Sequence, residues 1–211
     1  MKHKIGTVFM FLGALLVLGA GLLYLHNHQE EAVAEESVRV VLPQILEQIP
    51  SQPPSQLPKD YGVPLELLDP TAFEMKEVEV DGYGYIGCLT IPALGLELPI
   101  MGDWDYSRLQ VAPCRYSGSI RGEDLVLMAH NYAKHFGKLS QLSPGDPVIF
   151  TDMDGVITHY RVVALDVLHP KAVEEMTAGV YDLTLFTCTY GGKSRVTVYC
   201  DRLAESSGHN G

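Results

Sequence analysis

One long uncharged stretch stands out in the hydrophobic pattern of the chain. Residues 5–25 contain no Asp, Glu, Lys or Arg. A helix rising 1.5 Å per residue over this stretch would span about 30 Å, the thickness of a bilayer's hydrocarbon core. Two lysines precede the stretch, whereas Glu30 and Glu31 lie after it. Because positive flanks stay in the cytoplasm, we predict that residues 1–25 form a cytoplasmic tip and a transmembrane signal anchor, with the later residues outside the cell.

A cleaved signal peptide is the alternative explanation of this stretch. The Ala-Val-Ala sequence at 32–34 resembles a peptidase site. However, a secretory apolar region usually spans about 7 to 15 residues, and here the run is longer and lies well upstream of that site. The pattern therefore favours an uncleaved anchor, and either explanation exports the rest of the chain.

Residues 26–75 have the pattern of an extracellular stalk or linker. Apolar residues fall at helical spacing between Val38 and Ile49, but Pro43 is expected to kink or interrupt a helix there. The segment PSQPPSQLPKD at 50–60 is rich in proline and is expected to be extended and poorly packed.

From about residue 76 the pattern changes to short β-prone segments bounded by Gly, Pro and Asp. It predicts one mostly-β domain over residues 76–205, either a barrel or a sandwich, with a short tail at 206–211. The expected strands are residues 85–91, 96–100, 124–129, 147–151, 156–168, 182–188 and 195–203. Short helices are expected at 106–111, 136–142 and 171–176.

The last two expected strands form a hairpin around the Gly191-Gly192 turn. A turn over 189–194 places Cys188 opposite Arg195 and Leu183 opposite Cys200. Because alternate residues of a strand point to opposite faces, Cys188 and Arg195 share one face. The other face collects an apolar set suited to the core: Leu183, Leu185, Val196, Val198 and Cys200.

The same register decides which disulfides are possible. Cys188 and Cys200 would lie about 17 Å apart along the strands, too far for a bridge. Cys200 is therefore interpreted as a small buried hydrophobic residue. A bridge between Cys88 and Cys114 stays open, since an exported domain meets oxidising conditions.

Charge and metal-ligand spacing exclude several classes of function. The net charge of −11, with no cluster of Lys and Arg, argues against a nucleic-acid partner. No two cysteines have Cys-x-x-Cys spacing, and His130 with His135 alone is a weak metal signal. We therefore predict neither a metal nor a cofactor.

Cys188 is the candidate nucleophile. A thiol attacks as its thiolate, so it needs a nearby cation or base and partial exposure. Arg195 supplies a cation that could also bind a developing oxyanion. His130 ends the apolar run LVLMA at the boundary between a strand and a loop, where it could act as a general acid and base. A purely structural histidine is the alternative for His130.

Several motifs carry a resemblance to a known family. LTLFTC at 183–188 resembles the Thr-Leu-x-Thr-Cys signature of sortases, and RVTV at 195–198 resembles their arginine-bearing strand. DLVLMAHN at 124–131 is similar to the segment with their histidine, and FGKLSQLSPGDPVIF at 136–150 is similar to their next segment. IGCLTIPALGLELPIMG at 86–102 resembles their opening strands.

The resemblance implies a fold and a reaction. Sortases are membrane-anchored cysteine transpeptidases of Gram-positive bacteria, so we expect a closed β-barrel of seven to eight strands with short helices. Cys188 would attack a Leu-Pro-x-Thr-Gly-like sorting signal between Thr and Gly, and His130 would protonate the leaving amine. Arg195 would position the signal and stabilise the oxyanion, and Thr187 would support them.

The resemblance also implies partners. These are secreted proteins with a C-terminal sorting signal, an amine acceptor on a peptidoglycan precursor or another protein, and the membrane through residues 5–25. Asp69-Pro70 is followed by Thr71 and not by the aromatic residue of a pilus-type lid, and the chain ends without a second apolar span. We therefore expect attachment of surface proteins to the cell wall, with pilus assembly as the alternative.

Two other functions are possible, and one short sequence resembles a sorting signal by chance. A thiol hydrolase would resolve the acyl enzyme with water, and a non-catalytic binding module would function without Cys188. The sequence LPIMG at 98–102 resembles a sorting signal. We interpret it as the end of a strand, because no terminal apolar span and basic tail come after it.

Overall fold

The computed structural model describes residues 2–51 and 74–204. Its α-helices are α1 (Lys2–Gln48), α2 (Tyr106–Val111) and α3 (Val173–Thr177), and its 3-10 helices are η3 (Pro92–Leu94), η4 (Leu139–Gln141) and η5 (Tyr190–Gly192). The strands are β1 (Val78–Val80), β2 (Tyr83–Ile91), β3 (Leu96–Met101), β4 (Cys114–Ser117), β5 (Leu125–Ala129), β6 (Pro147–Asp152), β7 (Ile157–Leu168), β8 (Leu183–Cys188) and β9 (Arg195–Arg202).

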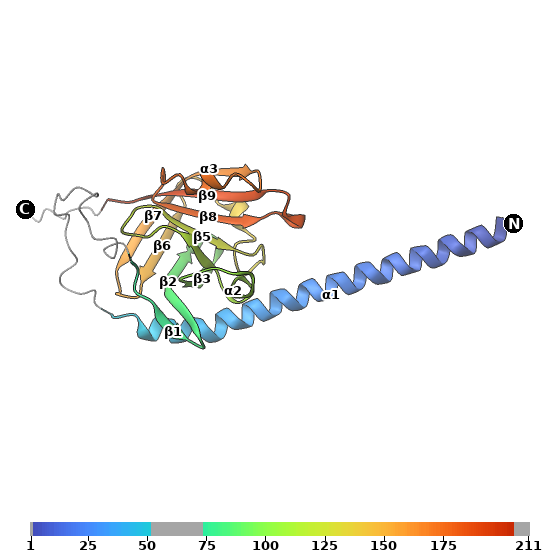
Figure 1. Ribbon diagram of the computed structural model, residues 1–211, viewed down its shortest axis with the longest axis horizontal. Helices are drawn as coiled ribbons and strands as arrows, with labels where there is room; N and C mark the ends of the chain where they lie inside the picture. The colour runs from blue at the N-terminus through green and yellow to red at the C-terminus, as the bar shows by residue number, and fades with distance from the viewer. Residues whose placement is uncertain (1, 52–73, 205–211) are drawn as a thin grey trace, which may run out of the picture.

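Eight of these strands close into a barrel (Figure 1). Their hydrogen-bonded order is β2-β3-β4-β5-β8-β9-β7-β6, β6 pairs back to β2, and β1 pairs with the first residues of β2. The pairs β3–β4 and β5–β8 are parallel, and the others are antiparallel. The predicted mostly-β fold and closed barrel are confirmed, and the sandwich alternative is wrong.

The barrel interior is filled by one large apolar cluster. Strand parity places its members on the inward face of every barrel strand except the short β4. From the β8–β9 hairpin they include Leu183, Leu185, Val198 and Cys200, with Val196 packed beside them. This is the apolar face that the hairpin register predicted.

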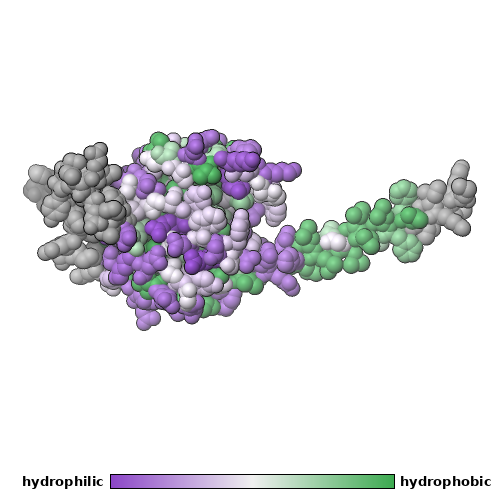
Figure 2. All heavy atoms as spheres, viewed as in Figure 1, coloured by the Kyte–Doolittle hydropathy of each residue, from purple (hydrophilic) through white to green (hydrophobic). Residues whose placement is uncertain are grey.

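Helix α1 is long and apolar enough to cross a membrane by length and composition. It runs along one side of the barrel and leaves it at the end where the β8–β9 hairpin turns (Figure 1). Beyond the barrel its apolar side chains are exposed (Figure 2). An uncovered apolar helix of this length is typical of a membrane anchor, which is consistent with single-pass anchoring.

The C-terminal half of α1 packs on the barrel. Ala34, Val41 and Ile45 are buried, and the last two belong to an apolar cluster with Tyr85 and Met101. The helix continues through Pro43, so the expected interruption is wrong. A proline removes one backbone donor, and burial of residues on both sides of Pro43 favours the continuous helix.

The expected proline-rich linker lies mostly outside the described residues. Residues 52–73, which include the Asp69-Pro70-Thr71 sequence, are not described, nor is the expected tail at 206–211. The domain boundaries expected at residues 25, 75 and 205 therefore stay predictions.

All seven expected strands are present, with ends that differ by at most two residues. β1 and β4 were missed because each is only three or four residues long. The helix expected at 136–142 is only the 3-10 turn η4. Phe136, Leu139 and Leu142 of this segment are buried in the core of the barrel.

The four cysteines are all free. Cys88 and Cys114 lie in β2 and β4, and the open possibility of a bridge between them is not realised. Cys200 is fully buried, as its interpretation as a small hydrophobic residue requires. Burial raises the pKa of the Cys200 thiol to about 12, whereas Cys188 is partly exposed.

Candidate active site

Three adjacent strands bring His130, Cys188 and Arg195 together. In the parallel pair β5–β8, Ala129 is in register with Thr187, so the next residues along, His130 and Cys188, are neighbours at the ends of these strands. In the antiparallel pair β8–β9, Cys188 lies opposite Arg195. All three residues are partly exposed. The structure therefore groups the three expected catalytic residues at one end of the barrel.

The turn between β8 and β9 fixes the position of Cys188. Thr189 and Ser194 close it through a backbone hydrogen bond of 2.9 Å, and the Ser194 amide also donates to Thr189 Oγ1 at 3.1 Å. Gly191 and Gly192 both have a left-handed backbone, with φ of 74° and 68°. Because glycine adopts this conformation without a steric penalty, the pair permits the tight return that places Arg195 beside Cys188.

Thr187 joins the two strands that carry the nucleophile and the histidine. Its side chain is buried, and its hydroxyl donates a 2.8 Å hydrogen bond to the carbonyl oxygen of Ala129. This bond connects β8 to β5 one residue before Cys188 and His130. Thr187 is therefore placed to hold the strand ends in register.

The surroundings of His130 favour its neutral form. Burial lowers the pKa of His130, and the Glu30 carboxylate on α1 opposes this shift. The Tyr132 ring lies against the imidazole, with ring centroids 5.0 Å apart. A histidine that is neutral near pH 7 but can accept a proton suits alternating acid and base steps.

A cavity of about 210 Å³ lies beside Cys188. Its walls come from the loop after β5, from η4 and from the β8–β9 hairpin. The lining residues are Asn131, Phe136, Gly137, Ser140, Thr187, Cys188, Thr189, Tyr190 and Val196. The cavity has room for a small group next to the sulfur, and Asn131 and Ser140 were not expected from the sequence.

A small cluster of buried apolar residues lies on the outer face of the same strands as Cys188. Phe186 shares strand parity with Cys188 and clusters with Val126 and Met176. The Tyr116 ring meets Phe186 edge-on at a centroid distance of 5.4 Å. Strand parity could have placed Phe186 on this face, but the contribution of Tyr116 from the short β4 had no sequence signal.

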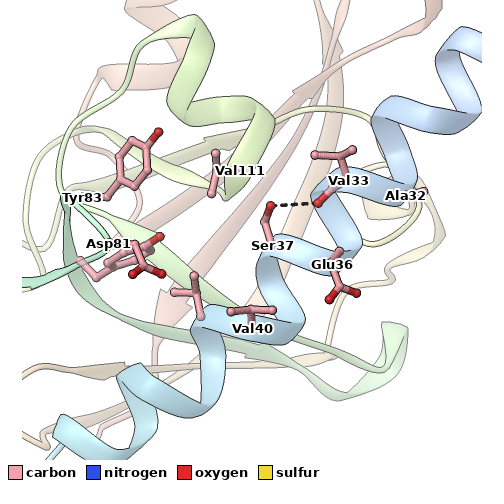
Figure 3. A pocket seen from close by; sticks show the side chains of 10 residues that line it. Ala32, Val33, Glu36, Ser37, Val40, Asp81, Tyr83 and Val111 are labelled. Carbon is pink, nitrogen blue, oxygen red and sulfur yellow. Dashed lines mark hydrogen bonds between the residues drawn. The ribbon is translucent and has the colours of Figure 1, made fainter.

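A larger cavity of about 530 Å³ lies away from this chemistry. It is bounded by α1 and the barrel wall, with Val33 and Val40 facing Tyr83 and Val111 (Figure 3). None of His130, Cys188 and Arg195 lines it. Among the described residues, no three His, Cys, Asp or Glu side chains are grouped so that they could hold a metal ion.

Comparison with known proteins gives the family. The family model of the sortase domain matches residues 89–203. Sortase C1 of Streptococcus suis is 27% identical, with a TM-score of 0.52 over 58% of this chain and 75% of that chain. Sortase C1 of Streptococcus agalactiae is 27% identical, with a TM-score of 0.51 over 59% and 70%.

A third solved structure is similar over a longer part of the chain. Sortase A of Corynebacterium diphtheriae is 22% identical, with a TM-score of 0.53 over 85% of this chain and 86% of that chain. Comparison with curated proteins finds no significant match. Because the family model covers more than half of the residues, the chain belongs to the sortase family, a family of transpeptidases.

Proposed function

We propose that the protein is a membrane-anchored cysteine transpeptidase that cleaves a Leu-Pro-x-Thr-Gly-like sorting signal and joins it to an amine. The observation that carries the proposal is the placement of His130, Cys188 and Arg195 at the ends of three adjacent strands. A nucleophile, a proton carrier and a cation beside one another are the groups that acyl transfer needs.

In the first half of the reaction, neutral His130 takes the proton of the Cys188 thiol, and the resulting thiolate attacks the carbonyl carbon between Thr and Gly of the signal. A C–S bond forms, and the electron pair of the C=O moves to oxygen, where the Arg195 guanidinium stabilises the negative charge. When the carbonyl re-forms, the C–N bond breaks and protonated His130 gives its proton to the leaving amine. The product is a thioester on Cys188.

In the second half, an incoming amine attacks the thioester. Neutral His130 takes the proton from the amine, the new C–N bond forms, and Cys188 leaves as its thiolate. The enzyme is then ready for another signal. Thr187 supports both halves by holding β5 and β8 in register through its bond to Ala129.

The apolar cluster on the Cys188 face of β5 and β8 would lie against the apolar start of such a signal. In this cluster Phe186 and Val126 pack against Met176 of α3. Burial of a Leu or Pro side chain there would contribute about 1.5–3 kcal/mol. The cavity of about 210 Å³ beside Cys188 would have room for a small amine.

Residues 5–25 would hold the enzyme in the membrane, with the N-terminus in the cytoplasm and the barrel outside. The proposed physiological role is attachment of secreted proteins to a peptidoglycan precursor. The alternative is an acceptor amine on another protein, as in pilus assembly. The amine that the enzyme uses distinguishes the two roles.

Product analysis of the full-length protein in detergent micelles tests this proposal. Signal peptides varied at the x position are incubated with glycine amines, with lysine peptides or without an amine, and products are separated by mass spectrometry. We expect an amine-dependent ligated product that is lost in Cys188→Ala and retained in Lys193→Ala, an exposed hairpin control. Cleavage only to the free acid would instead identify a thiol hydrolase, and activity in Cys188→Ala would exclude Cys188 as the nucleophile.

A further inference from the structure

The loop after His130 is held by the anchor helix. The backbone amide of Ala133 donates a 2.7 Å hydrogen bond to Glu31 Oε1, and the Tyr132 hydroxyl donates to Glu30 Oε2 at 3.5 Å. Lys134 pairs with Glu35 at 3.2 Å. Three consecutive loop residues therefore contact three acidic residues of α1.

These acidic residues lie on the face of α1 that is seated on the barrel. Residues three or four positions apart share one face of a helix, which groups Glu30 and Glu31 with Ala34 and Val38. Ala34 is fully buried, and Val38 packs against the barrel core. The packing of Ala34 and Val38 thus holds the part of the helix that carries these glutamates against the barrel.

The loop transmits this contact to His130 because it is folded tightly on itself. The His130 carbonyl oxygen accepts from the Phe136 amide at 3.2 Å, and the Tyr132 carbonyl oxygen accepts from the amides of His135 and Gly137 at 3.0 and 2.9 Å. A side chain at 137 would collide with the carbonyl oxygens of Asn131 and Tyr132. These contacts tie the loop to His130, the residue that begins it.

We propose that Glu30 and Glu31 are positioning residues for His130: Glu31 fixes the loop through the Ala133 amide, and Glu30 holds the Tyr132 side chain that lies against the imidazole and adds a negative charge near it. This inference rests on the proposed role of His130 as proton carrier. It means that the membrane anchor also completes the catalytic site, so that the histidine is correctly held only when α1 is seated on the barrel.

The charged and titratable groups around His130 come from four elements. On α1 they are His26, Glu30, Glu31 and Glu35, and in the loop they are Tyr132, Lys134 and His135. From β8 and β9 they are Cys188 and Arg195. Glu30 raises the pKa of His130 against the effect of burial, so removal of its charge should lower that pKa further.

Histidine NMR of the full-length protein in micelles tests the role of Glu30 without any substrate. The ring resonances of labelled histidines are titrated with pH, and His130 is assigned by its loss in His130→Asn. In Glu30→Gln the pKa of His130 should fall below that of the wild type. Glu47→Gln, an exposed residue farther along the same helix, should leave it unchanged. Equal pKa values in Glu30→Gln and Glu47→Gln would overturn the role of Glu30.

A matched pair of variants tests Glu31. Glu31→Gln keeps an oxygen that accepts from the Ala133 amide, whereas Glu31→Ala removes it. We expect Glu31→Ala to shift the His130 resonance and to lower kcat/KM for peptide transfer about fivefold, with Glu31→Gln close to the wild type. Identical His130 resonances in Glu31→Ala and the wild type would overturn this role. Because the NMR comparison needs no turnover, it decides the inference even if the proposed reaction fails.

Discussion

At the scale of single residues, the proposed role of Arg195 depends on the chemistry of its guanidinium group. It faces Cys188 across β8 and β9, and its Nη1 donates to the Ser194 carbonyl at 3.4 Å. A guanidinium presents several donors in a fixed fork, whereas an ammonium is a point charge. The proposed oxyanion role therefore depends on arginine and not on positive charge alone.

We predict that Arg195→Ala lowers kcat/KM about 10²–10³-fold, because one preformed oxyanion donor is lost, and that Arg195→Lys restores only a small part. The control is Arg202→Lys, at the other end of β9, where the arginine pairs with Glu123. Peptide-transfer kinetics measure kcat/KM of each variant, and thermal unfolding curves check that each variant is folded. Full activity of Arg195→Lys would contradict the need for a fork of donors.

His135 makes the stability of the protein depend on pH. It is fully buried, and within residues 2–51 and 74–204 neither ring nitrogen has a hydrogen-bond partner. Burial lowers the pKa of His135 to about 4, whereas an unfolded histidine titrates near about 6.5. Between these values the unfolded state binds more protons, so the stability contributed by neutral His135 is lost as the pH falls from about 6.5 to about 4, by about 3 kcal/mol at most.

His135→Phe should remove this dependence. We predict a flatter plot of unfolding midpoint against pH between about 4 and 6.5, followed by the fluorescence of Trp104, the single tryptophan of the chain. His159→Phe, a substitution in an exposed strand position, is the control and should keep the wild-type slope. Equal slopes in all three proteins would show that His135 is not buried in its neutral form.

At the scale of elements, local patterns predicted the β8–β9 hairpin fully. The two glycines located its turn, and strand parity then gave the Cys188–Arg195 pair and the core face. His130 could not be placed beside Cys188 by the same reasoning. Its position depends on the parallel β5–β8 pair, a contact between strands far apart in the sequence that periodicity does not encode. Only the family resemblance placed it in the site.

The packing of α1 on the barrel was also not predicted from sequence patterns. The apolar residues between Val38 and Ile49 have helical spacing, but Pro43 led us to expect a kinked or interrupted helix. The buried Ile45 shows the contribution of tertiary packing. Such packing can override a local preference against helix.

We predict that Ile45→Ala weakens the attachment of α1 to the barrel by about 2–5 kcal/mol, the usual effect of truncating a buried isoleucine. Leu46→Ala is the matched control, because Leu46 is 42% exposed. Hydrogen exchange of the α1 amides near residues 38–48 in the full-length protein measures the difference. Equal exchange rates in the two variants would show that the attachment of α1 to the barrel does not depend on Ile45.

At the scale of the whole molecule, closure of the barrel depends on a contact that only glycine permits. Gly87 of β2 pairs with Asp152 of β6. A Cβ at position 87 would collide with the Thr151 carbonyl oxygen and meet the Phe150 ring at 2.8 Å. The strand itself was predictable, but the close approach of β6 was not, because the partner strand lies far away in sequence.

Gly87→Ala should therefore destabilise the barrel by about 1–3 kcal/mol through overpacking, measured as the denaturant midpoint from Trp104 fluorescence. Gly84→Ala lies on the same strand, and its added Cβ would meet only the Glu77 side chain, which can move aside. We expect the Gly84 variant to stay close to the wild type. A Gly87 variant as stable as the Gly84 variant would contradict the tight closure.

The whole molecule also places the candidate site near the proposed membrane surface. α1 leaves the barrel at the end where β8 and β9 turn (Figure 1), and Glu30 contacts the loop after His130. Glu30 is five residues beyond the apolar run that ends at Leu25, or about 8 Å of helix. In the proposed topology the site would therefore lie near the bilayer surface, where a signal peptide held by its own membrane segment would be presented.

The mass of the intact protein tests the central claim, acyl transfer through Cys188, most directly. Full-length protein is incubated with a Leu-Pro-x-Thr-Gly peptide in the absence of amine, and the adduct is mapped by peptide digestion. The account predicts a mass increase equal to the acyl fragment ending in Thr, located on Cys188, removed by added amine and absent from Cys188→Ala. Peptide cleavage by Cys188→Ala, or an adduct on another residue, would contradict it.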